Sequence, residues 1–230
     1  MADPNRVLFE SVVQLLAPLL NELVFVGGST AGLFMTDLAA SGIRPTQDVD
    51  AIVDVTSYAQ YAALSERLRA LGLVEDTTPG APLCRWRRDD RIIDVMPIDE
   101  HVLGFSNRWY PAAIETAQTI SIAGRHVRVV TPALFVATKL EAFHGRGGND
   151  IFASHDLEDI IAVVDGRPEI VSDVTAASTD VRRYIASEFQ ALLDNRDFVE
   201  ALGGFLLPDA ASQRRRNLLH ERLAVLSTLR

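Results

Sequence analysis

Cysteine and lysine are the scarcest reactive residue types in this sequence of 230 residues, which contains a single cysteine, Cys84, and a single lysine, Lys139. One cysteine cannot form a disulfide within the chain, so the fold does not depend on a disulfide framework. The first residues also lack the charged, apolar and small-residue pattern of a secretory signal. We therefore expect a cytoplasmic protein that is stabilised by an apolar core.

Long apolar runs are absent as well. Hydrophobic residues make up 48% of the chain, but polar or charged residues interrupt every apolar stretch before the roughly 20 residues that a membrane-spanning helix requires. The counts of 14 glycines and 10 prolines are too low for a collagen-like or low-complexity chain. The sequence predicts a soluble globular protein with no membrane partner.

Positive charge is in deficit, with 22 basic against 31 acidic residues and a formal net charge of −9. A protein that mainly coats nucleic acid usually has a basic surface, so this balance argues against that class. An overall negative charge still allows local basic patches on the surface. The arginines around Arg85 and the triplet 214–216 suit either solvated faces or contacts with an RNA backbone.

Hydrophobic periodicity predicts alternating helices and strands in the first part of the chain. Apolar residues at helical spacing predict a helix from about Pro4 to Leu20, and the apolar run 23–26 predicts a strand that ends at a glycine pair. The other predicted elements are a helix that opens at Ser29, a strand over 48–55, a helix over 57–71, a hairpin of 83–88 and 91–98, and a second hairpin over 119–130.

Helical periodicity dominates from Pro132 onward, where Thr131 and Pro132 form a capped helix start and Ser154 is a second N-cap candidate. The whole pattern predicts an α/β fold, more narrowly α+β. A mixed sheet flanked by helices forms a first domain over 1–130, and a helical domain follows over 131–230.

Gly27, Gly28 and Ser29 lie at the predicted turn between a strand and a helix. Two glycines remove the side chains that would keep a triphosphate away from the backbone. A helix that opens at Ser29 would add unpaired N–H groups and the positive end of its dipole. A glycine pair alone is more often a plain turn, so this motif needs support from elsewhere in the chain.

Acidic residues on the following strand supply that support. Asp48 and Asp50 are separated by one residue, so both carboxylates point to the same face of a strand and can hold one or two Mg²⁺ ions. Asp94, on a later strand, would add a third ligand or act as a base toward an attacking hydroxyl. A solvent-exposed strand would also tolerate such a pair, but carboxylates crowded near a glycine turn repel one another unless a cation offsets their charge.

Lys139 stands out because every other basic residue is an arginine. A retained lysine favours a place where a compact ammonium is needed rather than a planar guanidinium. Chance survival in a chain of biased composition is the alternative interpretation. Arg146, in a predicted loop, is a candidate phosphate partner, although exposed loop arginines are usually solvated.

Two segments carry a resemblance to a known family. VGGS over 26–29, followed by DVDAIVDV over 48–55, resembles the signature of the DNA polymerase β-like nucleotidyltransferase superfamily. The stretch TPALFVATKLEAFHGRGGNDIFASHDLEDI over 131–160 resembles the second signature of its abortive-infection type IV toxin branch, which includes the AbiEii and MenT toxins. The two signatures together span residues 23–165.

The resemblance implies roles for individual residues. By position, Ser29 would contact the triphosphate, Asp48 and Asp50 would be metal ligands, and Lys139 would hold phosphate oxygens. Asp156 would orient that lysine or the nucleotide. Two further positions, Arg44 and Thr46, match places where that branch often has an arginine and a small hydroxyl residue.

These observations together predict an enzyme that transfers a nucleoside monophosphate from an NTP to an acceptor hydroxyl, with Mg²⁺ or Mn²⁺ as cofactor. From the resemblance, the acceptor is the 3′ end of tRNA, and the protein is the toxin of a toxin–antitoxin pair with a cognate antitoxin as partner. One alternative is a nucleotidyltransferase that modifies an aminoglycoside or lincosamide antibiotic. Another is a catalytically inactive nucleotide-binding module.

Overall fold

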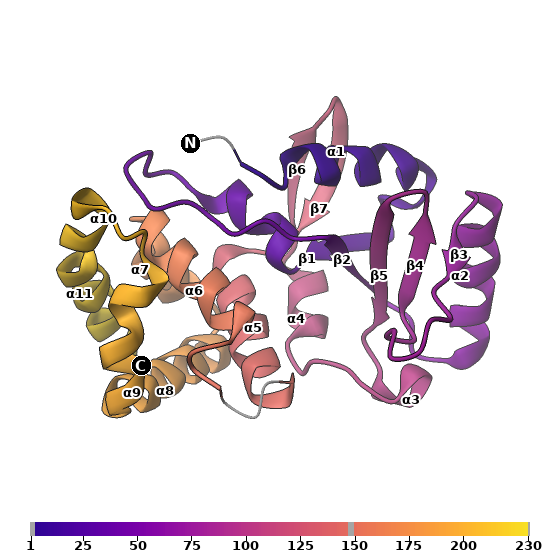
Figure 1. Cartoon of the computed structure of the whole chain (residues 1–230). Coiled ribbons are helices and arrows are strands. Elements are labelled where there is room, and N and C mark those ends of the chain that lie inside the picture. Colours follow the sequence, from indigo (N-terminus) through magenta and orange to yellow (C-terminus); the bar gives the residue numbers. More distant parts are fainter. Residues whose placement is uncertain (1–2, 147–149, 230) are drawn as a thin grey trace. The chain divides into compact units, whose positions relative to one another are not determined.

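The computed structural model describes residues 3–146 and 150–229, and the chain divides into two compact units (Figure 1). The sheet unit comprises Pro4–Thr30 and Pro45–Thr131, and the helical unit comprises Met1–Asp3, Ala31–Arg44 and Pro132–Arg230. Apart from the segment Ala31–Arg44, which groups with the helices, this division follows the change from mixed to helical periodicity near residue 130.

Within the described residues, the sheet unit contains a seven-stranded mixed sheet in the order β3-β4-β5-β2-β1-β7-β6 (Figure 1). The strands are β1 (Leu23–Val26), β2 (Asp48–Val53), β3 (Val74–Glu75), β4 (Arg85–Arg88), β5 (Arg91–Pro97), β6 (Gln118–Ile122) and β7 (Arg125–Val129). The central strand β2 runs antiparallel to β1 and parallel to β5. The α/β fold class predicted from the sequence is confirmed.

Both predicted hairpins are present. Strands β4 and β5 pair antiparallel around Asp89 and Asp90, and strands β6 and β7 pair around Ala123 and Gly124. Asp89 and Ala123 adopt positive φ angles of 54° and 48°, as the first position of a tight two-residue hairpin turn requires. The alternating pattern therefore predicts both the strands and their turns.

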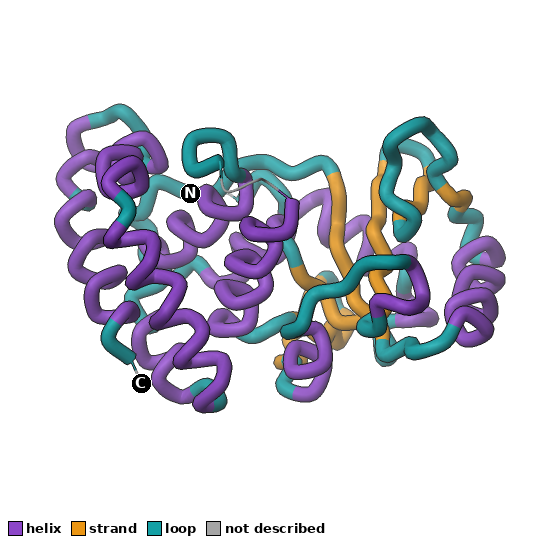
Figure 2. Tube along the Cα trace, turned by 90° about the horizontal axis from the view of Figure 1, so that it is seen from below, coloured by secondary structure: helices purple, strands orange, loops and turns teal. Residues whose placement is uncertain are grey.

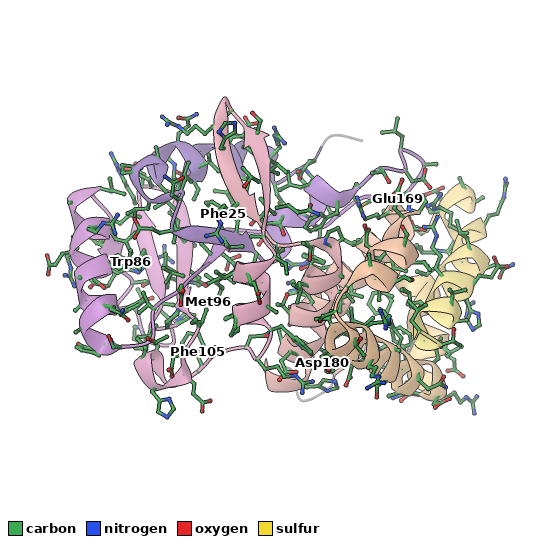
Figure 3. The ribbon with its side chains drawn as sticks, turned by 180° about the vertical axis from the view of Figure 1, so that it is seen from behind. Phe25, Trp86, Met96, Phe105, Glu169 and Asp180 are labelled. Atoms are coloured by element: carbon green, nitrogen blue, oxygen red, sulfur yellow. The ribbon has the colours of Figure 1, made fainter. Side chains whose placement is uncertain are left out.

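One face of the sheet is covered by the helices α1 (Arg6–Leu15) and α2 (Tyr58–Ala70). Phe9 of α1 packs edge-on against Phe25 of β1, with ring centroids 5.1 Å apart. The Arg69 guanidinium of α2 lies 5.9 Å from the ring centre of Trp86, and Trp86 is almost fully buried. Phe25 and Trp86 are labelled in Figure 3. Phe25 and Trp86 pair with Ala51 and Ile93, which alternate in the strands with the aspartates of β2 and β5. The aspartates therefore lie on the opposite face of the sheet.

Two helix predictions in this region need correction. The helix expected to open at Ser29 is a 3₁₀ helix, η2 (Gly28–Phe34), and no α-helix follows it before β2. The first helix ends at Leu15 instead of Leu20, and a short 3₁₀ helix, η1 (Ala17–Leu19), follows it. Pro18 accounts for the earlier end, because proline cannot donate a helical hydrogen bond and disfavours helical geometry in the residue before it.

Helix α2 follows the predicted rules for its ends. The Ser57 hydroxyl accepts a hydrogen bond from the backbone N–H of Gln60, and Gly72 ends the segment with a φ of 79°. Two shorter helices complete the sheet unit, namely α3 (Glu100–Leu103) and α4 (Tyr110–Glu115).

The helical unit is a bundle of helices, drawn purple in Figure 2. In it α8 (Thr179–Asp194) and α11 (Arg216–Ser227) pack together, and α5 (Pro132–Arg146) packs on both α6 (His155–Gly166) and α8. The Ser154 side chain caps α6 by accepting a hydrogen bond from the N–H of Leu157, as predicted. None of the helices among the described residues has the length and apolar character needed to cross a bilayer. The helices are α5 (Pro132–Arg146), α6 (His155–Gly166), α7 (Ile170–Ala176), α8 (Thr179–Asp194), α9 (Arg196–Ala201), η3 (Leu202–Phe205), α10 (Ala210–Arg214) and α11 (Arg216–Ser227).

Candidate functional site

Asp48, Asp50 and Asp94 lie on one face of the sheet. Strand β2 lies between β1 and β5 (Figure 1). Asp50 pairs with Asp94 in the parallel register of β2 and β5, and with Val26 in the antiparallel register of β1 and β2. Asp48 opens β2 and shares the parity of Asp50. The sequence prediction that the three carboxylates gather at one place therefore agrees with the strand register.

The glycine turn lies directly against this acidic face. Gly27 has a φ of 72°, and a side chain built on it would collide with the carboxylate of Asp50. Two independent reasons thus require glycine here, since the left-handed backbone disfavours other residues and the space is already occupied. The turn after β1 and the acid of β2 approach each other as closely as a missing side chain allows.

Ser29 has an unusual environment in this turn. Its side chain is 1% exposed, and its hydroxyl has no hydrogen-bond partner among the described residues. The neighbouring Thr30 hydroxyl donates to the carbonyl of Gly27 at 2.8 Å, which closes the turn. A buried polar group without a partner is costly, by about 1–3 kcal/mol, so the Ser29 hydroxyl is a candidate ligand donor. Ser29 lies at the start of η2, which is a 3₁₀ helix instead of an α-helix.

Asp48 is held at the entrance of β2 by a chain of polar contacts. The Asn5 side chain accepts a hydrogen bond from the backbone N–H of Thr46 at 2.8 Å, and Asn5 is almost fully buried. The Thr46 hydroxyl in turn donates to Asp48 Oδ1 at 2.8 Å. This arrangement orients one oxygen of Asp48 before any ligand is bound.

Arg85 is the residue of this site that the sequence analysis did not identify. Its Nε lies 2.8 Å from Asp94 Oδ1, and its Nη2 lies 2.8 Å from Asp94 Oδ2 and 3.0 Å from Asp48 Oδ2. The hydrogen bonds to Asp94 are the main cause of a raised pKa of the Arg85 guanidinium, which keeps it fully charged. This contact could have been predicted from the sequence, because a hairpin that turns at residues 89–90 places residue 85 opposite residue 94.

A metal fits part of this donor set. Asp48 and Asp50 offer two carboxylates on one face, and Mg²⁺ is commonly held by one or two carboxylates together with substrate phosphates. Among the residues that the structure describes, no group of three or more His, Cys, Asp or Glu side chains is arranged to hold a metal ion. The expectation of a third carboxylate ligand at Asp94 stays a prediction without support from this geometry.

The helical unit contains a second charged cluster around Lys139 of α5. The Lys139 ammonium lies 2.9 Å from Asp156 Oδ1 and 2.7 Å from Asp159 Oδ2, and both carboxylates belong to α6. Arg44 forms a two-pronged contact with Asp159, with Nε 2.9 Å from Oδ1 and Nη2 3.1 Å from Oδ2. We name the four residues Lys139, Asp156, Asp159 and Arg44 the lysine cluster. Lys139 is 7% exposed and Asp159 is 2% exposed, so the centre of this cluster is buried.

Asp159 is the member of the lysine cluster whose role the sequence analysis missed. From the sequence alone, Asp159 is equally well explained as an acid that complements the helix dipole near the start of α6. In the structure its carboxylate bridges Lys139 and Arg44. Its spacing of three residues from Asp156 places both on one helix face, which was a usable signal.

The remaining predicted phosphate partner, Arg146, is the last residue of α5, and its side chain lies outside the described part of the chain. Residues 147–149 of the predicted loop lie outside it too. The acidic strand cluster, defined as Asp48, Asp50, Asp94 and Arg85, belongs to the sheet unit, whereas the lysine cluster of Lys139, Asp156, Asp159 and Arg44 belongs to the helical unit.

Solved structures resemble this fold. The antibiotic-resistance factor ANT(2'')-Ia superposes with a TM-score of 0.50 and 14% sequence identity, over 82% of this chain and 97% of that one. An antigenic nucleotidyltransferase-like protein from Paracoccidioides brasiliensis gives a TM-score of 0.49 and 18% identity, over 86% and 92% of the two chains. JHP933 from Helicobacter pylori gives 0.48 and 13%, over 96% and 89%.

No protein-family model matches the sequence, and no curated protein matches it significantly. The likeness to ANT(2'')-Ia decides the fold. The chain has a nucleotidyltransferase-like fold. At 14% identity this likeness concerns the fold alone, so the activity must be argued from the residues.

Proposed function

We propose that this nucleotidyltransferase-like protein is an enzyme that transfers a nucleoside monophosphate from an NTP to an acceptor hydroxyl. The observation that carries the proposal is the meeting of Gly27 with the carboxylate face of Asp48 and Asp50. Arg85 offsets part of the negative charge of this face, and a site for a cation and a phosphate chain accounts for both the remaining charge and the close glycine turn.

Each residue has a distinct part in this proposal. Asp48 and Asp50 would hold a divalent cation, Mg²⁺ or Mn²⁺, which when bound offsets phosphate charge and acidifies a coordinated hydroxyl. The buried hydroxyl of Ser29 would donate to a phosphate oxygen, which satisfies a donor that has no partner among the residues described. The backbone around Gly27 and Gly28 leaves room for the phosphate chain to approach.

Lys139 keeps the role that the resemblance implies, that of a phosphate-binding residue oriented by Asp156. Its support is the 2.9 Å contact between the Lys139 ammonium and Asp156, together with its burial. Arg146 stays a predicted phosphate partner on the strength of its position in the sequence.

For the acceptor, we propose the 3′ end of tRNA in a toxin–antitoxin setting, on the strength of the resemblance over 131–160 to the toxin branch. A cognate antitoxin protein is the partner that this setting implies. The second candidate is a cationic aminoglycoside. It is favoured by the fold likeness to ANT(2'')-Ia, which is described as an antibiotic-resistance factor, and by the net charge of −9.

One transfer assay tests the activity and separates the two acceptors. The wild-type protein is incubated with Mg²⁺ and each α-labelled NTP in turn, with either total tRNA or an aminoglycoside as acceptor. Asp48→Asn is the test variant. Asp54→Asn is the matched control, because Asp54 is an exposed carboxylate just beyond the other end of the same strand.

We expect wild type and D54N to label the same acceptor, and D48N to be slower by about 100-fold or more, since loss of metal-based charge stabilisation costs several kcal/mol. Label on tRNA alone supports the toxin proposal, and label on the aminoglycoside alone supports the second candidate. Equal labelling by D48N and D54N, or no labelling with any NTP and either acceptor, would contradict the proposed activity.

A further inference from the structure

Arg85 covers the carboxylate of Asp94, which would otherwise be available as a third metal ligand. Its guanidinium bonds both oxygens of Asp94, each at 2.8 Å, and Asp94 is 6% exposed. The Asp94 side chain is 9% exposed and that of Asp48 is 32% exposed, so a metal ion has much less access to the remaining lone pairs of Asp94 unless it displaces the two-pronged charge pair. Such pairs are strong and directional, and leaving the arginine without its partner carries a further penalty.

The backbone, rather than a chance rotamer, keeps Arg85 in this place. The β4–β5 hairpin sets Arg85 directly opposite Asp94, and the parallel β2–β5 register sets Asp94 beside Asp50. The guanidinium also reaches Asp48, with Nη2 3.0 Å from Oδ2. A shift of the hairpin by one residue would turn Arg85 to the other face of the sheet.

We propose that Arg85 is a built-in cation of the acidic strand cluster, so that the cluster binds one divalent cation, on Asp48 and Asp50, and Asp94 acts through Arg85 instead of binding metal. This inference rests on the proposed function, because it concerns the same site. It makes Arg85 and Asp94 positioning residues and limits the metal ligands of this face to the acid pair of β2.

The charges of the cluster agree with a single cation. Three carboxylates and one guanidinium leave a formal charge of −2, which one divalent ion offsets. Two oxygens already have partners in the protein, since Asp48 Oδ1 accepts from Thr46 and Asp48 Oδ2 accepts from Arg85. Additional lone pairs on these oxygens can still face a cation, because a carboxylate offers about four acceptor positions.

Direct counting of bound Mn²⁺ tests the inference without relying on activity. Mn²⁺ is titrated into the full-length protein, and the free ion is followed by electron paramagnetic resonance, first alone and then with the nonhydrolysable α,β-methylene NTP analogue. The analogue alone is titrated in parallel, so that the Mn²⁺ it carries can be subtracted. The variants are Asp94→Asn, Arg85→Gln and the double variant Asp48→Asn with Asp50→Asn.

We expect one Mn²⁺ per wild-type chain beyond that held by the analogue, and a dissociation constant within about threefold of wild type for D94N. R85Q frees the Asp94 carboxylate and is expected to raise the count from one ion to two. If R85Q does not fold, D94N still decides the question, because it removes the charge of Asp94 while keeping its shape. Circular dichroism melts identify any variant that is unfolded.

Two ions on the wild type, or loss of Mn²⁺ binding in D94N, would overturn the role of Arg85 while leaving the proposed activity intact. No ion on the wild type, or unchanged binding by the double variant, would instead defeat the metal site of the proposed function and this inference with it. The two failures are thus distinguishable in the same titration.

Discussion

The acidic strand cluster and the lysine cluster each contain a buried aspartate that is paired with basic side chains. The two clusters differ in the kind of secondary structure that brings these side chains together. In the sheet unit, neighbouring strands place Arg85 opposite Asp94 through backbone register. In the helical unit, Lys139 and Arg44 reach Asp159 from a helix and a loop. The strand cluster therefore follows from local pairing, whereas the lysine cluster depends on how helices pack.

The two clusters also differ in how their charge is shared. Both oxygens of Asp94 accept hydrogen bonds from one guanidinium, whereas Asp159 is held by Arg44 and Lys139 together. Removing one cation should consequently affect the two clusters unequally.

Cys84 gives the largest expected effect and reports on the sheet unit. Burial is the main cause of raising the pKa of its thiol from 9 to about 12, with smaller contributions from Asp94 and Asp50. At pH 9 the thiol of the unfolded chain is half ionised and that of the folded chain about one thousandth, so we expect alkylation by iodoacetamide to be ~500-fold slower in the folded protein.

The sign of the pH effect follows from the raised pKa. The stability that comes from keeping this thiol neutral is fully present below pH 9 and is lost as the pH rises toward 12. The Arg85 charge lowers the pKa of this thiol, so R85Q should slow the alkylation of Cys84 in the folded protein further, and Lys139→Met should leave it unchanged. Equal alkylation rates in native and denaturing buffer would show that Cys84 is not buried as described.

Loss of one cation from each cluster should give the next largest effect. Arg85→Gln leaves Asp94 buried without its guanidinium, and we expect the free energy of unfolding to fall by about 3 kcal/mol. Lys139→Met leaves Asp159 with Arg44, so we expect a smaller loss, of about 1–2 kcal/mol. Urea denaturation followed by circular dichroism measures both, and a larger loss for K139M would contradict the comparison.

Gly27 tests the contact between the glycine turn and the acidic face. Gly27→Ala combines left-handed strain with a collision at Asp50, so we expect a loss of about 2 kcal/mol and weaker Mn²⁺ binding. Gly124→Ala is the matched control, because Gly124 has a φ of 77° and nothing within 4 Å of an added Cβ. The control should cost about 1 kcal/mol and leave Mn²⁺ binding unchanged. Similar Mn²⁺ affinities for G27A and G124A would contradict the claim that the glycine turn at Gly27 is part of the metal site.

Exchanging the two kinds of cation should have the smallest effect. Arg85→Lys loses the two-pronged contact with Asp94, and Lys139→Arg forces a planar group between two helix carboxylates. We expect each exchange to lower the free energy of unfolding by about 1 kcal/mol. Thermal melts of the two variants check this, and a stabilised R85K would show that the fork geometry is unimportant.

Much of the fold can be predicted from the sequence because its signals are local. Alternating residues predict β2 and both hairpins, and Ser57 and Ser154 mark helix starts that the structure confirms. The helix expected to open at Ser29 is present, but it is not an α-helix, although the segment is rich in helix-forming residues. The structure has a 3₁₀ helix there, which shows that context outweighs a weak local preference.

In the candidate site too, the features that depend on local sequence could be predicted, and those that depend on distant residues could not. The acid pair and the glycine turn could be predicted because each is a short motif, and the Arg85–Asp94 pair follows from hairpin register once the turn is known. The role of Asp159 could not be predicted with the same ease. It depends on a loop residue, Arg44, that lies more than a hundred positions away in the sequence.

Equilibrium binding of a labelled NTP, measured with and without Mn²⁺, tests the central claim most directly. We predict Mn²⁺-dependent binding by wild type and by D54N, and its loss when Asp48 and Asp50 are both changed to asparagine. Binding of equal strength in all three proteins, or binding that ignores Mn²⁺, would contradict the claim that the acid pair and the glycine turn form one nucleotide site.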